Sequence, residues 1–175
     1  KAAREGYSRH TEPEPLYEPA DVALSLPLLQ SVALEEWRQI RPGWRFRFRY
    51  NGHILGAAFI EMDLDGKRLV FSGDVGRPDI FPGIAKKLSA QLYDNLHKKL
   101  LKLPMFCAVY PAHGAGSLCG AHLSDEPVST IGQQRVSNPN LQHQSRGEFI
   151  AAILAGLSDP PAYFQHNAAL NQKGP

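Results

Sequence analysis

The chain has 175 residues, of which 43% are hydrophobic and 21% are charged. This length predicts one domain with a sizeable core, and the composition excludes collagen-like, coiled-coil and wholly disordered chains. The formal net charge of +2 is too small to indicate nucleic-acid binding by itself. Two cysteines, Cys107 and Cys119, cannot form a disulfide framework, which favours a reduced, cytoplasmic setting.

No run of residues is long and apolar enough to span a membrane, so no membrane partner is expected. The sequence opens at Lys1 with neither an initiator Met nor a signal peptide, and we interpret it as part of a longer protein. Residues 1–31 are rich in proline and acidic side chains, which breaks any long helix there. A short helix is predicted from Asp21, as its N-cap, through Leu24.

The first clear strand is predicted at residues 44–50, where aromatic and basic residues alternate strictly. One face of this strand is apolar and the other carries Arg45, Arg47 and Arg49. Two further runs, 57–64 and 68–72, flank Asp65-Gly66, a dipeptide that favours a tight hairpin turn.

The pattern then becomes helical from Ile84 to Leu103, where leucines recur every four residues. Residues 107–110 read as a short buried strand. Ser145 and Glu148 form a capping box that predicts a helix over 146–157. This order of elements predicts an α/β protein with helices packed on a sheet.

Three potential metal ligands, His53, Asp74 and His113, each follow an apolar run and have glycine close by. Strand ends deliver such side chains to one rim of a sheet, and two imidazoles with a carboxylate suit Zn, Fe or Mn. The spacings of 21 and 39 residues are too long for a zinc finger. The alternative is that each histidine is a hydrogen-bonded structural residue and that Asp74 is a turn residue.

Residues 52–56, 72–74 and 111–114 resemble the later metal motifs of the metallo-β-lactamase-fold superfamily. The resemblance implies an α/β fold, the C-terminal portion of an αββα sandwich, as a single partial domain over 1–175. It implies that His53 and His113 match metal-site histidines and that Asp74 matches the metal-binding carboxylate. The superfamily's earlier His-x-His-x-Asp-His motif does not occur in this sequence.

The resemblance divides near Asp74. Residues 1–78 resemble the β-CASP branch of RNA-processing nucleases, through the runs 6–11, 15–17 and 52–58. Residues 79–175, together with the preceding Gly73-Asp74-Val75-Gly76-Arg77-Pro78, resemble persulfide dioxygenases, especially those fused to a rhodanese domain. The longest stretch carrying this second likeness is 110–120.

The second likeness implies an oxygenase with one Fe(II) and a glutathione-type thiol persulfide as its small-molecule substrate. His53 and Asp74 would be two of the three iron ligands, with the third in the absent motif. Asp74 and His113 would be the catalytic residues, and His113 would lie near the iron without necessarily binding it. Arg77 and Cys119 would contact substrate, although a salt bridge and a tight-loop position are the plainer interpretations. A rhodanese domain would follow the C-terminus.

Two alternatives stay open. A metallohydrolase acting on RNA would use two Zn ions bridged by Asp74, with phosphates meeting the three strand arginines. The same arginines are also typical of a solvated face or a charge-protected edge, and the large cap domain of β-CASP nucleases is absent. The third reading is an inactive fragment, because half of a two-sheet sandwich leaves a sheet face without its partner.

Overall fold

The computed structural model describes residues 16–79, 82–114, 125–142, 145–157 and 163–173. The chain divides into two compact units, residues 1–32 and residues 33–175. The first unit contains helix α2 (Pro19–Ser25) and the 3₁₀ turn η1 (Leu26–Leu28). The predicted helix is confirmed, but its predicted N-cap is wrong. Glu18 is the N-cap, three residues earlier than predicted, because Pro19 favours the first helical position, and Asp21 instead accepts the Glu18 backbone N–H at 2.8 Å.

The second unit is built on a six-stranded sheet whose strands follow chain order. Neighbouring strands are antiparallel except β4 and β5, which are parallel. The predicted β2, β3, β4 and β5 are confirmed, while β1 and β6 were not predicted. The strands are β1 (Arg38–Arg41), β2 (Trp44–Tyr50), β3 (Ala58–Leu64), β4 (Lys67–Phe71), β5 (Ala108–Tyr110) and β6 (Ser129–Thr130).

The turn between β3 and β4 confirms the hairpin prediction. Asp65 and Gly66 both have positive φ, at 51° and 84°, which is the conformation that a two-residue hairpin turn requires.

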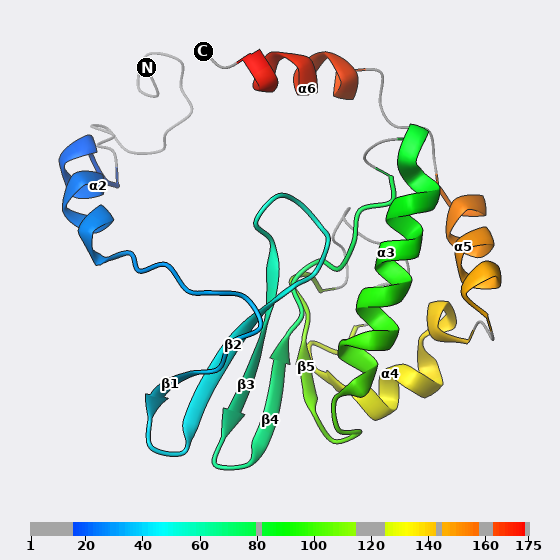
Figure 1. The fold of residues 1–175 in the computed structure, drawn as a ribbon, viewed down its shortest axis with the longest axis horizontal. Coiled ribbons are helices and arrows are strands. Elements are labelled where there is room, and N and C mark those ends of the chain that lie inside the picture. Colours follow the sequence, from blue (N-terminus) through cyan, green and yellow to red (C-terminus); the bar gives the residue numbers. More distant parts are fainter. Residues whose placement is uncertain (1–15, 80–81, 115–124, 143–144, 158–162, 174–175) are drawn as a thin grey trace. The chain divides into compact units, whose positions relative to one another are not determined.

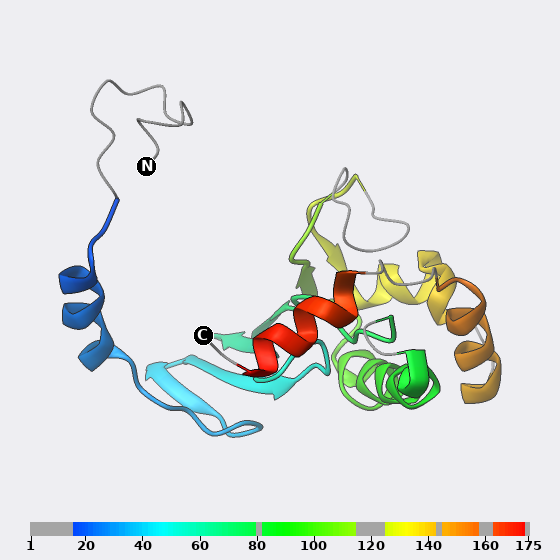
Figure 2. The ribbon, with the colours of Figure 1, turned by 90° about the horizontal axis from the view of Figure 1, so that it is seen from above.

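The helices α3, α4 and α5 gather on one side of the sheet (Figures 1 and 2). Helix α3 is shorter than predicted, because Lys99 leaves the helical region and a 3₁₀ turn then places Leu100 and Leu101 in the core. The capping box of Ser145 and Glu148 starts α5 as predicted. The described helical elements of this unit are η2 (Pro82–Ile84), α3 (Ala85–Lys98), η3 (Leu100–Lys102), α4 (Ile131–Ser137), η4 (Pro139–Leu141), α5 (Arg146–Ala155) and α6 (Tyr163–Lys173).

The two faces of the sheet differ in burial. Along β3 every second residue, starting at Phe59, is buried, and the residues between them are half-buried. Phe59 and Val70 pack with helical-layer residues into one core cluster, which also contains Leu100, Leu101, Leu103, Cys107 and Ile131. Cys107 is a core residue, as expected for a cysteine in an apolar strand. None of the described helices has the length and apolar character that a membrane crossing needs.

Candidate metal centre at the strand ends

The three predicted metal ligands occupy equivalent positions in the sheet. His53, Asp74 and His113 each lie three residues beyond the last residue of a strand: β2, β4 and β5 respectively. Strands β2 and β4 are both antiparallel to β3, and β5 is parallel to β4. Strands β2, β4 and β5 therefore run in the same direction and end at the same edge of the sheet. The sheet topology therefore brings the three residues to one rim.

The parallel pairing of β4 and β5 sets Asp74 opposite His113. Phe71 pairs with Tyr110, their rings stack at 5.1 Å between centroids, and the Ser72 N–H donates to the Tyr110 carbonyl at 3.0 Å. Equal three-residue extensions then place His113 Nε2 3.0 Å from Asp74 Oδ2. This contact joins two residues 39 positions apart, and it confirms that the strand ends converge.

His53 approaches the same carboxylate oxygen from β2. Its Nδ1 lies 3.0 Å from the Gly76 carbonyl oxygen, which can only accept, so Nδ1 carries a proton. In the neutral ring Nε2 is then an unprotonated acceptor, and it faces Asp74 Oδ2 at 3.5 Å. A ring nitrogen and a carboxylate oxygen that face each other in this way can share a proton or bind a metal ion.

The loops around this rim are held by buried polar contacts. Asn51 is buried, accepts the His53 backbone N–H at its side-chain oxygen, and accepts the Gly76 N–H at its carbonyl. Gly76 has φ +74°, and a Cβ there would lie 2.8 Å from Leu92 on α3. Only glycine fits this close approach, and it sets the carbonyl that orients His53.

The side chains of His53, Asp74 and His113 are of the types that bind metal ions, but they do not form a complete metal site. The three side chains are 17% to 34% exposed and offer two imidazole nitrogens and a carboxylate. These donors suit Fe(II) or Zn. Within the described residues, however, no group of three or more His, Cys, Asp or Glu side chains is arranged to hold a metal ion. The three residues fit as part of a metal site that needs further ligands.

Comparisons with known proteins agree with this architecture. The solved structure of a metallo-β-lactamase from Staphylococcus aureus superposes with a TM-score of 0.64 at 22% identity, covering 82% of this chain and 44% of that one. ETHE1 from Myxococcus xanthus superposes with a TM-score of 0.55 at 26% identity, covering 76% of this chain and 54% of that one. In sequence, the chain is 33% identical over 96 residues to the mitochondrial persulfide dioxygenase ETHE1 of Mus musculus. These comparisons support a metallo-β-lactamase fold for this chain.

A second sequence relative is an RNase J-like protein of Methanocaldococcus jannaschii, 34% identical over 59 residues, or 34% of this chain. No protein-family model matches the chain. The chain spans 32% of the mouse persulfide dioxygenase and 14% of the RNase J-like protein. The predicted fold class, an α/β portion of the metallo-β-lactamase fold, is confirmed.

Of the two predicted substrate contacts, Arg77 and Cys119, the structure describes Arg77. Arg77 forms a two-pronged ion pair with Asp79, with Nε 2.9 Å from Oδ1 and Nη2 2.8 Å from Oδ2. Burial raises the pKa of the Asp79 carboxyl, but the Arg77 hydrogen bond, a backbone hydrogen bond and the nearby positive charge of Arg77 together hold that pKa below its ordinary value. Arg77 therefore forms the salt bridge that was the alternative interpretation of this residue. Cys119 lies outside the described residues.

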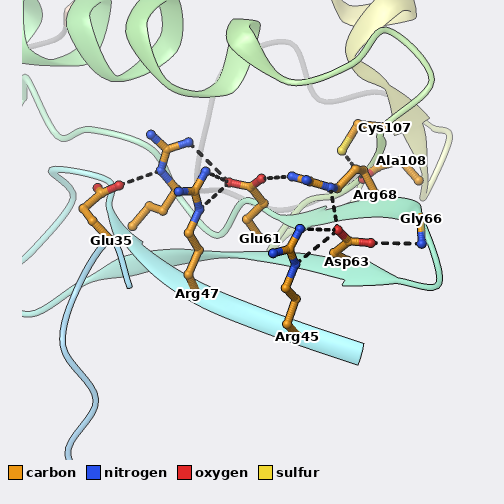
Figure 3. A network of polar contacts seen from close by, with 10 residues as sticks. Glu35, Arg45, Arg47, Glu61, Asp63, Gly66, Arg68, Cys107 and Ala108 are labelled. Carbon is orange, nitrogen blue, oxygen red and sulfur yellow. Dashed lines mark hydrogen bonds and ion pairs between the residues drawn. The ribbon is translucent and has the colours of Figure 1, made fainter. Parts of the chain in front are cut away.

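The arginine-bearing face of β2 is not at a sheet edge, because β2 lies between β1 and β3, and of its three arginines only Arg45 is exposed. This face lies against Glu61 and Asp63, which the β2–β3 register sets directly opposite Arg47 and Arg45. Figure 3 shows the two carboxylates lying between the guanidiniums. The alternation along β3, with Phe59, Glu61 and Asp63 on one face, was the sequence signal that could have predicted this pairing.

Glu61 is the centre of this network. Its side chain is fully buried, and it accepts hydrogen bonds from Arg47 at 2.7 and 2.9 Å, Arg49 at 3.3 Å and Arg68 at 2.6 Å. The hydrogen bond from Arg45 lowers the pKa of the Asp63 carboxyl. Trp37 lies against three guanidiniums, with ring-centroid distances of 4.5 Å to Arg45, 4.6 Å to Arg47 and 5.1 Å to Arg68.

Proposed function

We propose that this chain is the part of a metal-dependent oxygenase of the persulfide dioxygenase type that carries His53 and Asp74 as iron ligands. The observation that supports it is the rim where β2, β4 and β5 end, which brings His53 and His113 to one carboxylate oxygen. The likeness to persulfide dioxygenases favours this chemistry over other activities of the superfamily. The substrate would be a small thiol persulfide of the glutathione type.

Each residue has a separate role in this proposal. His53, locked by the Gly76 carbonyl, presents Nε2 as a neutral ligand, and Asp74 offers its carboxylate from the next strand end. One further protein ligand would be needed to complete the iron site. Bound Fe(II) supplies the one-electron chemistry that lets dioxygen react with sulfur.

His113 acts through Asp74 in the same proposal. The contact between His113 Nε2 and Asp74 Oδ2 at 3.0 Å orients the carboxylate and holds a proton beside it. His113 is therefore a positioning residue for the metal.

The proposal also includes a rhodanese domain as a partner that follows the C-terminus.

The test is the metal content of the purified chain, measured by elemental analysis after expression with both iron and zinc supplied. We expect about one iron per chain, lost when His53 and Asp74 are both changed to Ala. The matched control is His166→Ala with Asp65→Asn, which changes an exposed histidine of α6 and an exposed aspartate in the β3–β4 turn, at the opposite end of the strands from the rim. The control is expected to keep its iron.

Oxygen consumption with glutathione persulfide then tests the substrate class in the iron-loaded protein. A folded chain that binds no metal, or binds it equally in both double variants, contradicts the proposal and supports the inactive-fragment reading. Circular dichroism of each variant shows whether loss of metal reflects loss of the fold.

A second candidate, a zinc-dependent hydrolase acting on RNA, is favoured by the similarity to the RNase J-like protein. Asp74 would then bridge two Zn ions that activate a water molecule. About two zinc ions per chain and cleavage of a single-stranded RNA, with no oxygen consumption, would replace the first proposal by this one.

A further inference from the structure

A cavity lies on the helix-covered face of the sheet, and His53, Asp74 and His113 are not among its lining residues. Its volume is about 540 Å³, within the range of small-ligand pockets. The sheet forms one wall, and the segment from Lys99 to Phe106 forms the other. The residues that line it are Arg47, Arg49, Glu61, Asp63, Gly66, Arg68, Lys99, Lys102, Leu103, Pro104 and Phe106.

The buried carboxylate of Glu61 organises the cations of this cavity without using all their donors. Arg47 bonds through Nε and Nη2, Arg49 through Nε and Nη1, and Arg68 through Nη1 and Nε. One terminal nitrogen on each of the three guanidiniums therefore has no partner among the described residues. Three pre-oriented N–H groups from separate side chains are a typical arrangement for binding a phosphate group.

The charge of the cavity also favours an anion. Five cationic side chains line it against two carboxylates. Adding the ion-pair partners just outside the lining, Arg45 and Glu35, leaves a surplus of three positive charges. Lys102 is exposed and makes no ion pair with any described residue. Its charge is free to meet a ligand.

The carboxylates do not repel such a ligand strongly. The Glu61 side chain is fully buried, and both of its oxygens accept from guanidiniums. Asp63 accepts from Arg45 at one oxygen and from the Gly66 N–H at the other. These hydrogen bonds compensate the negative charges of Glu61 and Asp63. The N–H groups of the guanidiniums that these bonds do not use remain available to a ligand in the cavity.

We propose that this cavity binds a small phosphate-bearing molecule, such as a nucleotide or an inorganic polyphosphate. The guanidiniums and Lys102 would hold the phosphates. Phe106, which is 69% exposed at the rim, would pack against an aromatic or apolar remainder of the ligand. The walls on both sides favour a small molecule over an extended RNA strand. The site is independent of the metal centre and of the proposed oxygenase activity.

Calorimetric titration of the whole chain with pyrophosphate and with ATP tests the proposal. Trp37 contacts three guanidiniums of the network, so its fluorescence gives a second readout for pyrophosphate. We expect saturable binding of both probes, weakening as salt rises. Lys102→Ala should weaken both about tenfold, the loss of one charge-assisted contact. Phe106→Ala should weaken ATP several-fold and leave pyrophosphate unchanged.

Matched controls separate the cavity from general surface charge. Lys87→Ala removes an exposed lysine on α3, and Val136→Ala removes an exposed apolar side chain on α4. Both controls should bind like the unaltered chain, as should the protein with His53 and Asp74 changed to Ala. No saturable binding overturns the proposal, as does equal weakening by Lys87→Ala and Lys102→Ala. Binding of single-stranded RNA without binding of either small probe also overturns it.

Discussion

The strand-end rim and the arginine network lie on the same sheet but differ in how their carboxylates are paired. In the network a fully buried carboxylate, Glu61, receives hydrogen bonds from three guanidiniums, so its charge is satisfied within the protein. At the rim, His53 and Asp74 are partly exposed and present two acceptors to each other at 3.5 Å. A satisfied buried charge has a structural role, whereas an imidazole nitrogen and a carboxylate held close together by other contacts are donors that suit a cation.

Replacing the central carboxylate should have the largest effect on stability. Glu61→Gln leaves three half-buried guanidiniums without their counter-charge, and we expect a loss of about 3–5 kcal/mol in the free energy of unfolding. Urea denaturation followed by circular dichroism measures it. Glu36→Gln, at an exposed glutamate, should change stability by less than about 0.5 kcal/mol.

The same measurement on Asp74→Asn sharpens the contrast. The Asp74 side chain is 32% exposed and its described partners are the partly exposed rings of His53 and His113, so we expect a change of about 1 kcal/mol or less. Equal losses for Glu61→Gln and Asp74→Asn would contradict the division into a structural network and a binding rim.

The rim should depend on backbone shape more than on charge. Gly76→Ala puts a methyl group 2.8 Å from Leu92 at φ +74°, and we expect a loss of about 2–4 kcal/mol from backbone strain and crowding. Gly66→Ala also has positive φ, at 84°, but its Cβ meets open space, so about 1 kcal/mol is expected. Thermal unfolding of the two variants compares them directly, and equal destabilisation would remove the role given to Leu92.

Alkaline pH tests the burial next to the network. Burial, followed by the charge of Glu61, raises the pKa of the Cys107 thiol from 9.0 to about 11. The unfolded chain then releases this proton before the folded chain does. Stability is therefore full below pH 9 and falls as pH rises from 9 to 11. In Cys107→Ala the free energy of unfolding should not fall in this way between pH 9 and 11. Its slope against pH should differ from that of the unaltered chain by an amount approaching one proton, and identical slopes would show that the thiol is not shielded.

Acid should produce a smaller effect of opposite sign at Asp63. Its pKa is lowered, chiefly by the hydrogen bond from Arg45, so the unfolded chain takes up the proton first as pH falls. This contribution is present above about pH 4 and is lost as pH falls below it. Unfolding curves of Asp63→Asn and of the unaltered chain between pH 6 and 3 should converge toward acid pH, and parallel curves would contradict the assignment.

Much of the sheet could be predicted from local pattern. The alternation at residues 44–50 and the Asp65-Gly66 turn fix β2 and the β3–β4 hairpin, because period-two burial and positive φ are properties of neighbouring residues. The end of α3 could not be predicted in this way. Leucine spacing continues to Leu100, but Lys99 turns the chain so that Leu100 and Leu101 reach the core instead of extending the helix.

The candidate metal residues were predictable singly, and their convergence was not. The register of the parallel pair β4–β5, which sets Asp74 beside His113, depends on contacts between segments 39 residues apart. The partners of the arginines were not predicted for a different reason. Glu61 and Asp63 alternate with apolar residues on β3, so aligning β2 with β3 across the sheet would have predicted their pairing with the arginines. The sequence of β2 alone does not contain that information.

The most direct test of the rim as a metal site is anaerobic Fe(II) affinity, measured by competition with a chelator. The comparison needs the unaltered chain and three single variants: His53→Ala, Asp74→Ala and His113→Ala. We expect the first two variants to bind iron at least about a hundredfold more weakly and His113→Ala about tenfold more weakly, because His113 acts through Asp74. Equal affinity in all four proteins would show that the strand-end rim does not bind the metal.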